Sequence, residues 1–520
     1  MGKIAIILLE RFTSNEKKSF MRTTYIFFLV FFPFIIFAQG DIDPIKDQDL
    51  KNFLLLHKEL VSIPNLPENN ELMLKNINWV TNQYNKLDFN TTLLESNTLP
   101  ILLAEKVYNP NYKTVLFYFH IDGQPVNPDS WDQEDPFKPV LKEKDINGAW
   151  QNIDWHVLNG NIDDEWRIFA RAAADDKAPI IMLLAALKIL KEKNDNPKFN
   201  IKIIFDPEEE YSSEALLSTL DKYKDRYASD IFIVMDGPAH NSNKPTLTFG
   251  CRGIATCTIT TFGSKLPQHS GHFGNYVPNP VFSLAKLLSS MKDEDGKVLI
   301  KDYYTGIEIG PEAAKLLKAV PFDSTAFNNE LGIYTSEKVG KNYQESLQYP
   351  SLNIRQIGTS WTGEGLKTVI PEYAVASIDV RLVPEIDGEV QLLRIKKHIE
   401  QEGYYVIDGD PTDEERRTYP KIAKFNTSPA LNAFRTSPDL EFGKKIRAQL
   451  TKDFGYAPIV IRMMGGTVPI VPLIDKLNVP TVIVPMVNMD NNQHSPNENI
   501  RVGNIRQGIK ICLSILEMQL

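Results

Sequence analysis

The chain has 520 residues, 42% of them hydrophobic, which is enough for two or three domains with apolar cores. Its formal net charge of -9 argues against a nucleic-acid-binding protein, because no basic excess is available to neutralise phosphates. The cysteines Cys251, Cys257 and Cys512 form no close pair, so neither a disulfide framework nor a zinc knuckle is expected. A small-molecule or peptide partner is the better expectation.

The N-terminal region has the pattern of a secretory signal. An apolar run over residues 25–37 follows basic residues and ends before a polar stretch, and it is too short to span a bilayer comfortably. We predict a signal peptide at residues 1–39, with translation starting at Met1 or Met21, and export to the periplasm or beyond. An uncleaved membrane anchor is the alternative. No second apolar stretch of membrane length follows, so no stable span is expected in the mature protein.

Short apolar runs further along the chain predict buried strands at residues 114–119, 200–205, 230–235 and 480–485. Continuous hydrophobicity is typical of a mostly parallel sheet that is covered on both faces. Apolar residues at helical spacing predict a helix over residues 178–191. Strands that alternate with helices indicate an α/β layer architecture.

The pattern changes near residue 252. Alternating strands at residues 252–262 and 374–382, followed by a helical pattern at 389–402, favour a smaller α+β domain with one wet sheet face. Buried strands resume at residues 457–461. We therefore predict a catalytic domain from residues 45–246 and 424–520, with a second domain inserted at residues 247–423.

Acidic or imidazole side chains follow four of these strands, where ligands bind in open α/β sheets. Asp175 and Asp176 precede the predicted helix, whose N-terminus favours negative charge. The side chains that follow the strands are, in chain order, His120, Asp122, Glu208, Glu209, Glu210, Asp236 and His494.

So many carboxylates would repel one another without cations. Two histidines among carboxylates suit zinc, manganese or cobalt better than calcium, which prefers oxygen alone. Two metals that share one carboxylate can bind a bridging water, lower its pKa and polarise a substrate carbonyl. A further carboxylate that is not a ligand would serve as general base.

These residues resemble the co-catalytic dinuclear metallopeptidases, which include carnosinase-like dipeptidases, glutamate carboxypeptidase, aminoacylase and succinyl-diaminopimelate desuccinylase. The motifs are closest to those of the carnosinase-like dipeptidases, and their order covers nearly everything from residue 45 onward. The matching pieces are residues 120–122, 135–137, 171–177, 208–210, 236, 269–271, 368–371, 381–384, 465–467 and 494–498.

The resemblance implies a role for each residue of the site. His120 and Asp236 would bind one metal, Glu210 and His494 the other, and Asp175 would bridge both. Asp122 would orient His120 through its second ring N–H, and Glu209 would take the proton of the bridging water and pass it to the leaving amine. The Asp175–Asp176 peptide is expected to be cis.

The smaller domain is expected, by the same resemblance, to form a homodimer and to contact the substrate. His269 would stabilise the oxyanion in the partner's site. Arg381, Thr368 and Thr467 would hold the C-terminal carboxylate of a short peptide. For Arg381, a salt bridge on the strand surface is the alternative, and His272, close to His269, is expected to be a surface or loop residue and not a second catalytic group.

The sequence departs from the family pattern in two places. Alanines at positions 170, 172 and 178 stand where glycines are usual. About twenty extra residues at 147–165 form either a loop over the cleft or a surface excursion.

The expected activity is hydrolysis of a dipeptide or short peptide with a free C-terminal carboxylate, with two divalent metal ions, most simply zinc. Three alternatives stay open. They are a deacylase of N-acyl amino acids, a catalytically silent peptide-binding dimer and, explaining least, a periplasmic binding protein.

Overall fold

A mixed sheet of eight strands forms the centre of the computed structural model, which describes residues 45–360 and 367–520. The strand order is β1-β2-β7-β3-β8-β20-β9-β19, and the neighbouring strands β7, β3, β8 and β20 are parallel. The strands are β1 (Asn90–Leu94), β2 (Ile101–Lys106), β3 (Thr114–His120), β7 (Asn200–Asp206), β8 (Ile231–Val234), β9 (Thr246–Thr248), β19 (Ile459–Ile461) and β20 (Thr481–Ile483).

Both faces of this sheet are covered, as the continuous apolar strands predicted. On β3, Phe117 and Phe119 belong to one apolar core, whereas Leu116 and Tyr118 belong to the core on the opposite face. Successive side chains of a strand point to opposite faces, so a strand between two helical layers must be apolar throughout.

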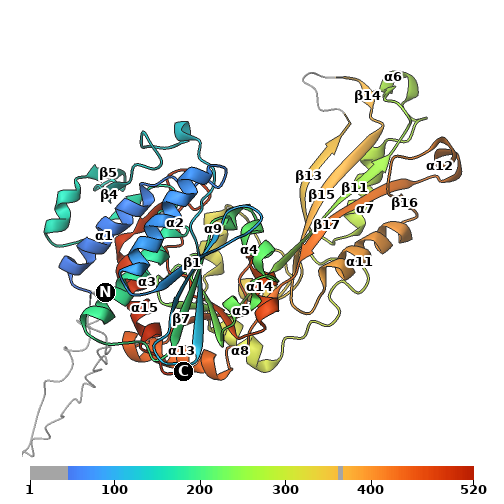
Figure 1. The fold of residues 1–520 in the computed structure, drawn as a ribbon. Helices are drawn as coiled ribbons and strands as arrows, with labels where there is room; N and C mark the ends of the chain where they lie inside the picture. The colour runs from blue at the N-terminus through green and yellow to red at the C-terminus, as the bar shows by residue number, and fades with distance from the viewer. Residues whose placement is uncertain (1–44, 361–366) are drawn as a thin grey trace, which may run out of the picture. The chain divides into compact units, whose positions relative to one another are not determined.

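Helices form these two layers (Figure 1). The larger core contains residues of α1 (Asp47–Val61), α2 (Asn70–Asn85), α3 (Lys177–Glu192), α13 (Glu441–Phe454) and α15 (Val502–Leu516). The opposite core contains residues of α4 (Glu214–Thr219), α5 (Lys224–Tyr227) and α14 (Val471–Leu477).

A four-stranded antiparallel sheet includes part of the extra segment at residues 147–165. Its order is β21-β6-β4-β5, with β4 (Val140–Lys144), β5 (Trp150–Ile153), β6 (Arg167–Phe169) and β21 (Asn499–Arg501). After β5, the short 3-10 helix η2 (Trp155–Asn159) packs on α1, where Lys58 Nζ lies 4.4 Å from the Trp155 ring centroid. The segment is therefore an excursion of the α1 side and not a loop over the cleft.

A five-stranded sheet in the order β13-β15-β11-β17-β16 forms the inserted part. One face packs on α7 (Pro280–Ser290) and α11 (Gly388–Gln401), as Figure 1 shows. Every second residue of β11 is only half-buried. The strands are β11 (Gly253–Phe262), β13 (Asn353–Thr359), β15 (Tyr373–Leu382), β16 (Tyr405–Ile407) and β17 (Ile422–Leu431).

The remaining elements are short. Two strand pairs are β10 (Gly250–Cys251) with β18 (Phe434–Arg435) and β12 (Gln268–His269) with β14 (Val369–Ile370). The others are η1 (Pro128–Ser130), η3 (Glu209–Tyr211), α6 (Ser270–Phe273), α8 (Pro311–Ala319), α9 (Ser324–Leu331), α10 (Tyr343–Ser346) and α12 (Asp413–Thr418).

The predicted architecture of a mostly parallel sheet with an inserted smaller α+β part is confirmed. The domain limits remain a prediction, and the last of them, between residues 423 and 424, falls inside β17. The three cysteines are buried and unpaired, as expected. Across the part of the chain that the structure describes, no helix is both long and apolar enough to cross a membrane.

Candidate dinuclear metal site

Four parallel strands bring the candidate ligands to one edge of the central sheet. His120 is the last residue of β3, Asp236 follows β8 by two residues, and Glu210 lies in η3, just after β7. The loop after β20 leads to His494. Because parallel strands end at the same edge, residues distant in sequence meet there.

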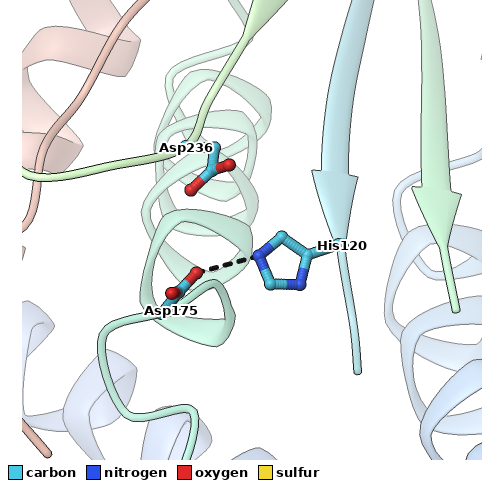
Figure 2. A group of neighbouring side chains, drawn as sticks. All are labelled: His120, Asp175 and Asp236. Carbon is cyan, nitrogen blue, oxygen red and sulfur yellow. Dashed lines mark hydrogen bonds and ion pairs between the residues drawn. The ribbon is translucent and has the colours of Figure 1, made fainter. Parts of the chain in front are cut away.

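Three of these side chains form the first group. His120 Nε2 lies 2.9 Å from Asp175 Oδ1, and Asp236 completes a set whose ligand atoms all lie within 4.8 Å of one another. Figure 2 shows the imidazole and the two carboxylates converging on the space between β3 and the start of α3. Asp175 and His120 are buried.

The second group shares Asp175. His494 Nε2 lies 3.1 Å from Asp175 Oδ2 and 3.3 Å from Glu210 Oε2. The ligand atoms of these three residues also lie within 4.8 Å of one another. Asp175 therefore presents one carboxylate oxygen to each histidine, as a bridging ligand would.

The charges of the two groups fit divalent cations. Burial, together with the nearby Asp175, raises the pKa of Asp236 to about 6 and that of Glu210 to about 7. Although burial opposes it, hydrogen bonds with His120 and His494 hold the pKa of Asp175 below its usual value. Within the described residues, the carboxylates of Asp175, Asp236 and Glu210 have no lysine or arginine partner, and carboxylates gathered this closely are a donor set for cations.

A buried carboxylate, Asp122, contacts the candidate ligands. Its buried Oδ1 lies 3.3 Å from His120 Nδ1, and its two oxygens accept hydrogen bonds of 3.0 Å from the backbone N–H groups of Glu209 and Glu210. One carboxylate thus orients both the imidazole and the turn that carries the two glutamates.

Glu209 belongs to neither group of candidate ligands. Burial first, and then the carboxylates of Asp236, Glu210 and Asp175, raise its pKa well above the usual value. A carboxylate in such surroundings has an increased affinity for a proton.

Glu498 is a site residue for which the sequence predicted no role. Its buried carboxylate accepts hydrogen bonds of 3.0 Å from the backbone N–H groups of Ala172, Ala174 and Asp175, and one of 2.7 Å from Arg171 Nη1. Glu498 lies in the same motif as the predicted metal ligand His494, four residues after it, and this position is the signal in the sequence that could have identified it.

Two more buried residues of the site were missed. Lys177 Nζ donates to the carbonyl groups of Leu60 and Ile63, at 3.0 and 2.7 Å, and burial lowers its pKa well below the usual value. His57 Nε2 lies 2.8 Å from the carbonyl oxygen of Ala173. Both hold the end of α1 and the loop after it against the chain that carries Asp175.

The backbone around Asp175 is unusual. The Asp175–Asp176 peptide is cis, as the resemblance predicted. Ala172, which replaces a usual glycine, has a φ of 57° in the left-handed region. Alanine is less favourable than glycine in this conformation, so the replacement raises the energy of the backbone at this position. It removes no candidate ligand.

The four predicted substrate residues form two separate pairs. Arg381 Nη1 donates to Thr467 Oγ1 at 2.8 Å, and His269 Nε2 lies 3.4 Å from Thr368 Oγ1. Within residues 45–360 and 367–520, neither pair has a hydrogen bond or ion pair with the candidate metal ligands. The His272 ring lies 4.7 Å from that of His269.

Paired imidazole and carboxylate groups at the carboxyl edge of a parallel sheet define the class of a metal-dependent hydrolase with two cations. The sequence profile of Peptidase family M20/M25/M40 matches residues 116–518, and the chain belongs to this family. The expected family relationship is thereby confirmed.

Individual relatives agree with this result. The chain is 27% identical to the Cys-Gly metallodipeptidase dug1 of Schizosaccharomyces pombe over 432 residues, covering 81% of this chain and 83% of the relative. It is 29% identical to the Beta-Ala-His dipeptidase of Mus musculus over 423 residues, covering 79% and 78%. A solved M20 family metallo-carboxypeptidase, Sso-CP2 from Sulfolobus solfataricus, superimposes with a TM-score of 0.71 at 26% identity, over 90% of this chain and 99% of that one. The chain is a metallopeptidase, and its relatives support metal-dependent hydrolysis of dipeptides.

The predicted export is wrong by the same comparison. The similarity to the dug1 enzymes and the Beta-Ala-His dipeptidases, over 81% and 79% of this chain, contradicts it. The apolar run that suggested a signal peptide at residues 1–39 lies outside the described residues. The predictions of a periplasmic or extracellular location and of a membrane anchor are therefore wrong.

Proposed function

We propose that this chain hydrolyses the peptide bond of dipeptides or short peptides that carry a free C-terminal carboxylate. The observation that supports this proposal best is the pair of ligand groups that share Asp175. His120 and Asp236 would hold one divalent cation, and Glu210 and His494 the other. Two cations bound there would supply a water of lowered pKa and polarise the scissile carbonyl.

Glu209 is the proposed general base. Its backbone is fixed by Asp122, and its raised pKa suits a group that must accept a proton from the attacking water and release it to the leaving amine. Asp122 acts through His120 and the glutamate turn, and it is a positioning residue.

The proposed substrate contacts lie on the inserted part and on the loop before α14. The guanidinium of Arg381, with Thr467 at 2.8 Å, suits a carboxylate that binds through two parallel hydrogen bonds. His269 would act in the site of a second copy of the chain, because the proposed protein is a homodimer. Thr368, whose Oγ1 lies 3.4 Å from His269 Nε2, would help to hold the C-terminal carboxylate of the substrate.

Zinc is the proposed metal. Two imidazoles and three carboxylates match the nitrogen and oxygen ligands of catalytic zinc sites. Manganese and cobalt accept the same ligand types. Metal analysis of the purified protein, followed by reconstitution of the metal-free chain with each ion, distinguishes the three.

A substrate panel tests the activity. Dipeptides should be hydrolysed faster than N-acetyl amino acids, since in the latter an acetyl group replaces the N-terminal residue of a dipeptide and its amino group. Preference for the acetylated set would replace the proposal with a deacylase, and binding of peptides without turnover would replace it with a silent binding protein.

The variant Glu209→Gln tests the role of the base. We expect kcat to fall by about 10²- to 10⁴-fold, because the proton acceptor is lost while the side chain keeps its shape. Metal content should stay at two ions for each chain. Glu214→Gln, an exposed change on α4, is the matched control. Full activity of the Glu209 variant would refute the assignment.

A further inference from the structure

A surface cavity of about 560 Å³ lies between α8, the segment after β18, α13 and the end of β19. Four cationic side chains line it, although the whole chain has a net charge of -9. They are Lys315, Arg435, Arg447 and Arg462, and the carboxylates of Glu312 and Asp439 line the same cavity.

Two of these four cations have an acidic partner. Arg447 Nη2 lies 3.1 Å from Asp439 Oδ1, and Arg435 Nη2 lies 2.5 Å from Glu385 Oε1. Arg462 donates to the side-chain oxygen of Gln348. Within the described residues, Arg462 has no carboxylate at ion-pair distance.

The guanidinium of Arg462 is in an unfavourable environment. It is half-buried, and this burial, followed by the charge of the neighbouring Arg435, lowers its pKa to about 10. A partly desolvated cation beside a second cation is stabilised by an anion that contacts both.

Hydroxyl donors lie in the same cavity. Thr436 Oγ1 accepts a hydrogen bond from the backbone N–H of Thr481, and Ser437 Oγ accepts one from Asp439. In each case the O–H group is left to donate. Guanidinium and hydroxyl donors together match the oxygens of a phosphate group.

The cavity is distinct from the metal site. Arg462 directly follows β19, which is parallel to β9, and β9 is antiparallel to β20. The carboxyl end of β19 therefore lies at the sheet edge opposite to the edge where β3 and β8 deliver the metal ligands. The hydrogen bond between Thr436 and Thr481, at the start of β20, places the cavity at that same opposite edge.

We propose that this cavity binds a small organic phosphate. The phosphate group would contact Arg462, Arg435 and the two hydroxyls, and the organic part would lie against Leu316 and Ala319 of α8. The volume falls within the range of about 300–1,000 Å³ that is typical of small-molecule sites. This site is additional to the peptidase activity and independent of it.

Titration calorimetry of the metal-loaded enzyme with inorganic phosphate and with phenyl phosphate tests the proposal. The metal centre can bind phosphate as well. The variant Arg462→Met should therefore bind phosphate more weakly in the cavity and leave any binding at the metal centre unchanged. We expect binding to this class to weaken at least about tenfold in Arg462→Met, because a charge-assisted pair is lost. Lys445→Met, which removes a cation from the outer side of α13, should bind like the wild type.

A second variant covers the case in which Arg462→Met does not fold. Lys315 is exposed on α8, and Lys315→Met should fold normally and weaken phosphate binding about threefold, with less dependence on salt. Equal phosphate binding by the wild type and both cavity variants would overturn the proposal. Equal or tighter binding of citrate at the same site would overturn the assignment to phosphates.

Discussion

Ala172 shows how a single residue near the candidate metal site affects the backbone. Its φ of 57° is a conformation that glycine adopts at little cost and that costs an alanine about 1–2 kcal/mol. Its N–H group donates to Glu498 at 3.0 Å, so the conformation is held by the site. The neighbouring Ala170, which also stands where glycine is usual, is not among the residues with positive φ.

The change Ala172→Gly should therefore stabilise the protein. We expect the free energy of unfolding to rise by up to about 0.5 kcal/mol, since relief of the left-handed strain exceeds the entropy that glycine adds to the unfolded chain and the loss of the buried methyl group together. Ala170→Gly is the matched control and should lower it by about 1–2 kcal/mol, because the unfolded chain gains entropy and the core loses a buried methyl group, with no strain to relieve. Denaturant unfolding measures both. The same sign for the two variants would show that the strain is not relieved.

At the scale of elements, the site depends on how two loops are joined. The loop before α3 carries Asp175, and the loop before β21 carries His494. Glu498 joins them through four hydrogen bonds, three of which come from backbone N–H groups. The geometry of the shared carboxylate and of the exposed histidine is thus set by one buried anion.

Glu498→Gln tests this connection. The amide turns one acceptor into a donor that faces backbone N–H groups, and it leaves Arg171 without its counter-charge. We expect a loss of about 3 kcal/mol in the free energy of unfolding and a metal affinity that is about 10- to 100-fold weaker. Denaturant titration and chelator competition measure these quantities. Glu165→Gln, which breaks an exposed pair with Arg501, should cost less than about 1 kcal/mol, and a similar cost for Glu498→Gln would refute its role.

At the scale of the whole molecule, the ligand cluster links stability to pH and metal. Asp236 and Glu210 have pKa values of about 6 and 7 in the folded protein, above their ordinary values of 3.8 and 4.5. The folded state therefore binds protons more tightly than the unfolded state in this range. By linkage, the metal-free protein loses stability as pH rises through these values.

Melting curves at about pH 5 and about pH 7.5 check this expectation. The melting temperature of chelator-treated protein should fall between the two, whereas that of metal-loaded protein should hold or rise, because cations replace the protons. Asp236→Asn should flatten the fall in the metal-free protein. Parallel pH profiles for the two forms would contradict the proposed ligand set.

The proposed dimer makes a further prediction for the whole molecule. If His269 acts in the site of the partner, His269→Ala and Glu209→Gln should each be inactive alone, yet active when mixed and allowed to exchange subunits. Half of the dimers would then hold one complete site, which corresponds to about a quarter of the wild-type activity. Mass spectrometry should first show that the mixture contains mixed dimers. If peptidase activity does not recover in such a mixture, His269 lies outside the partner's site.

Much of this protein is determined by the sequence itself. Continuous apolar runs predicted β3, β7, β8 and β20, because a strand buried on both faces cannot be polar. Alternation predicted the half-exposed sheet of the inserted part in the same way. The order of the acidic and imidazole residues was enough to indicate the family, since side chains that follow parallel strands meet at one edge.

Only the tertiary structure showed which long-range contacts hold the site together. Glu498, Lys177 and His57 act on backbone groups, and a backbone partner leaves no trace in the pattern of side chains. The course of residues 147–165 depends on packing against α1. The cationic side chains of the cavity come from segments that are up to 147 positions apart in the sequence, from Lys315 to Arg462. Such contacts are determined by the fold of the whole chain, because each local segment is compatible with several partners.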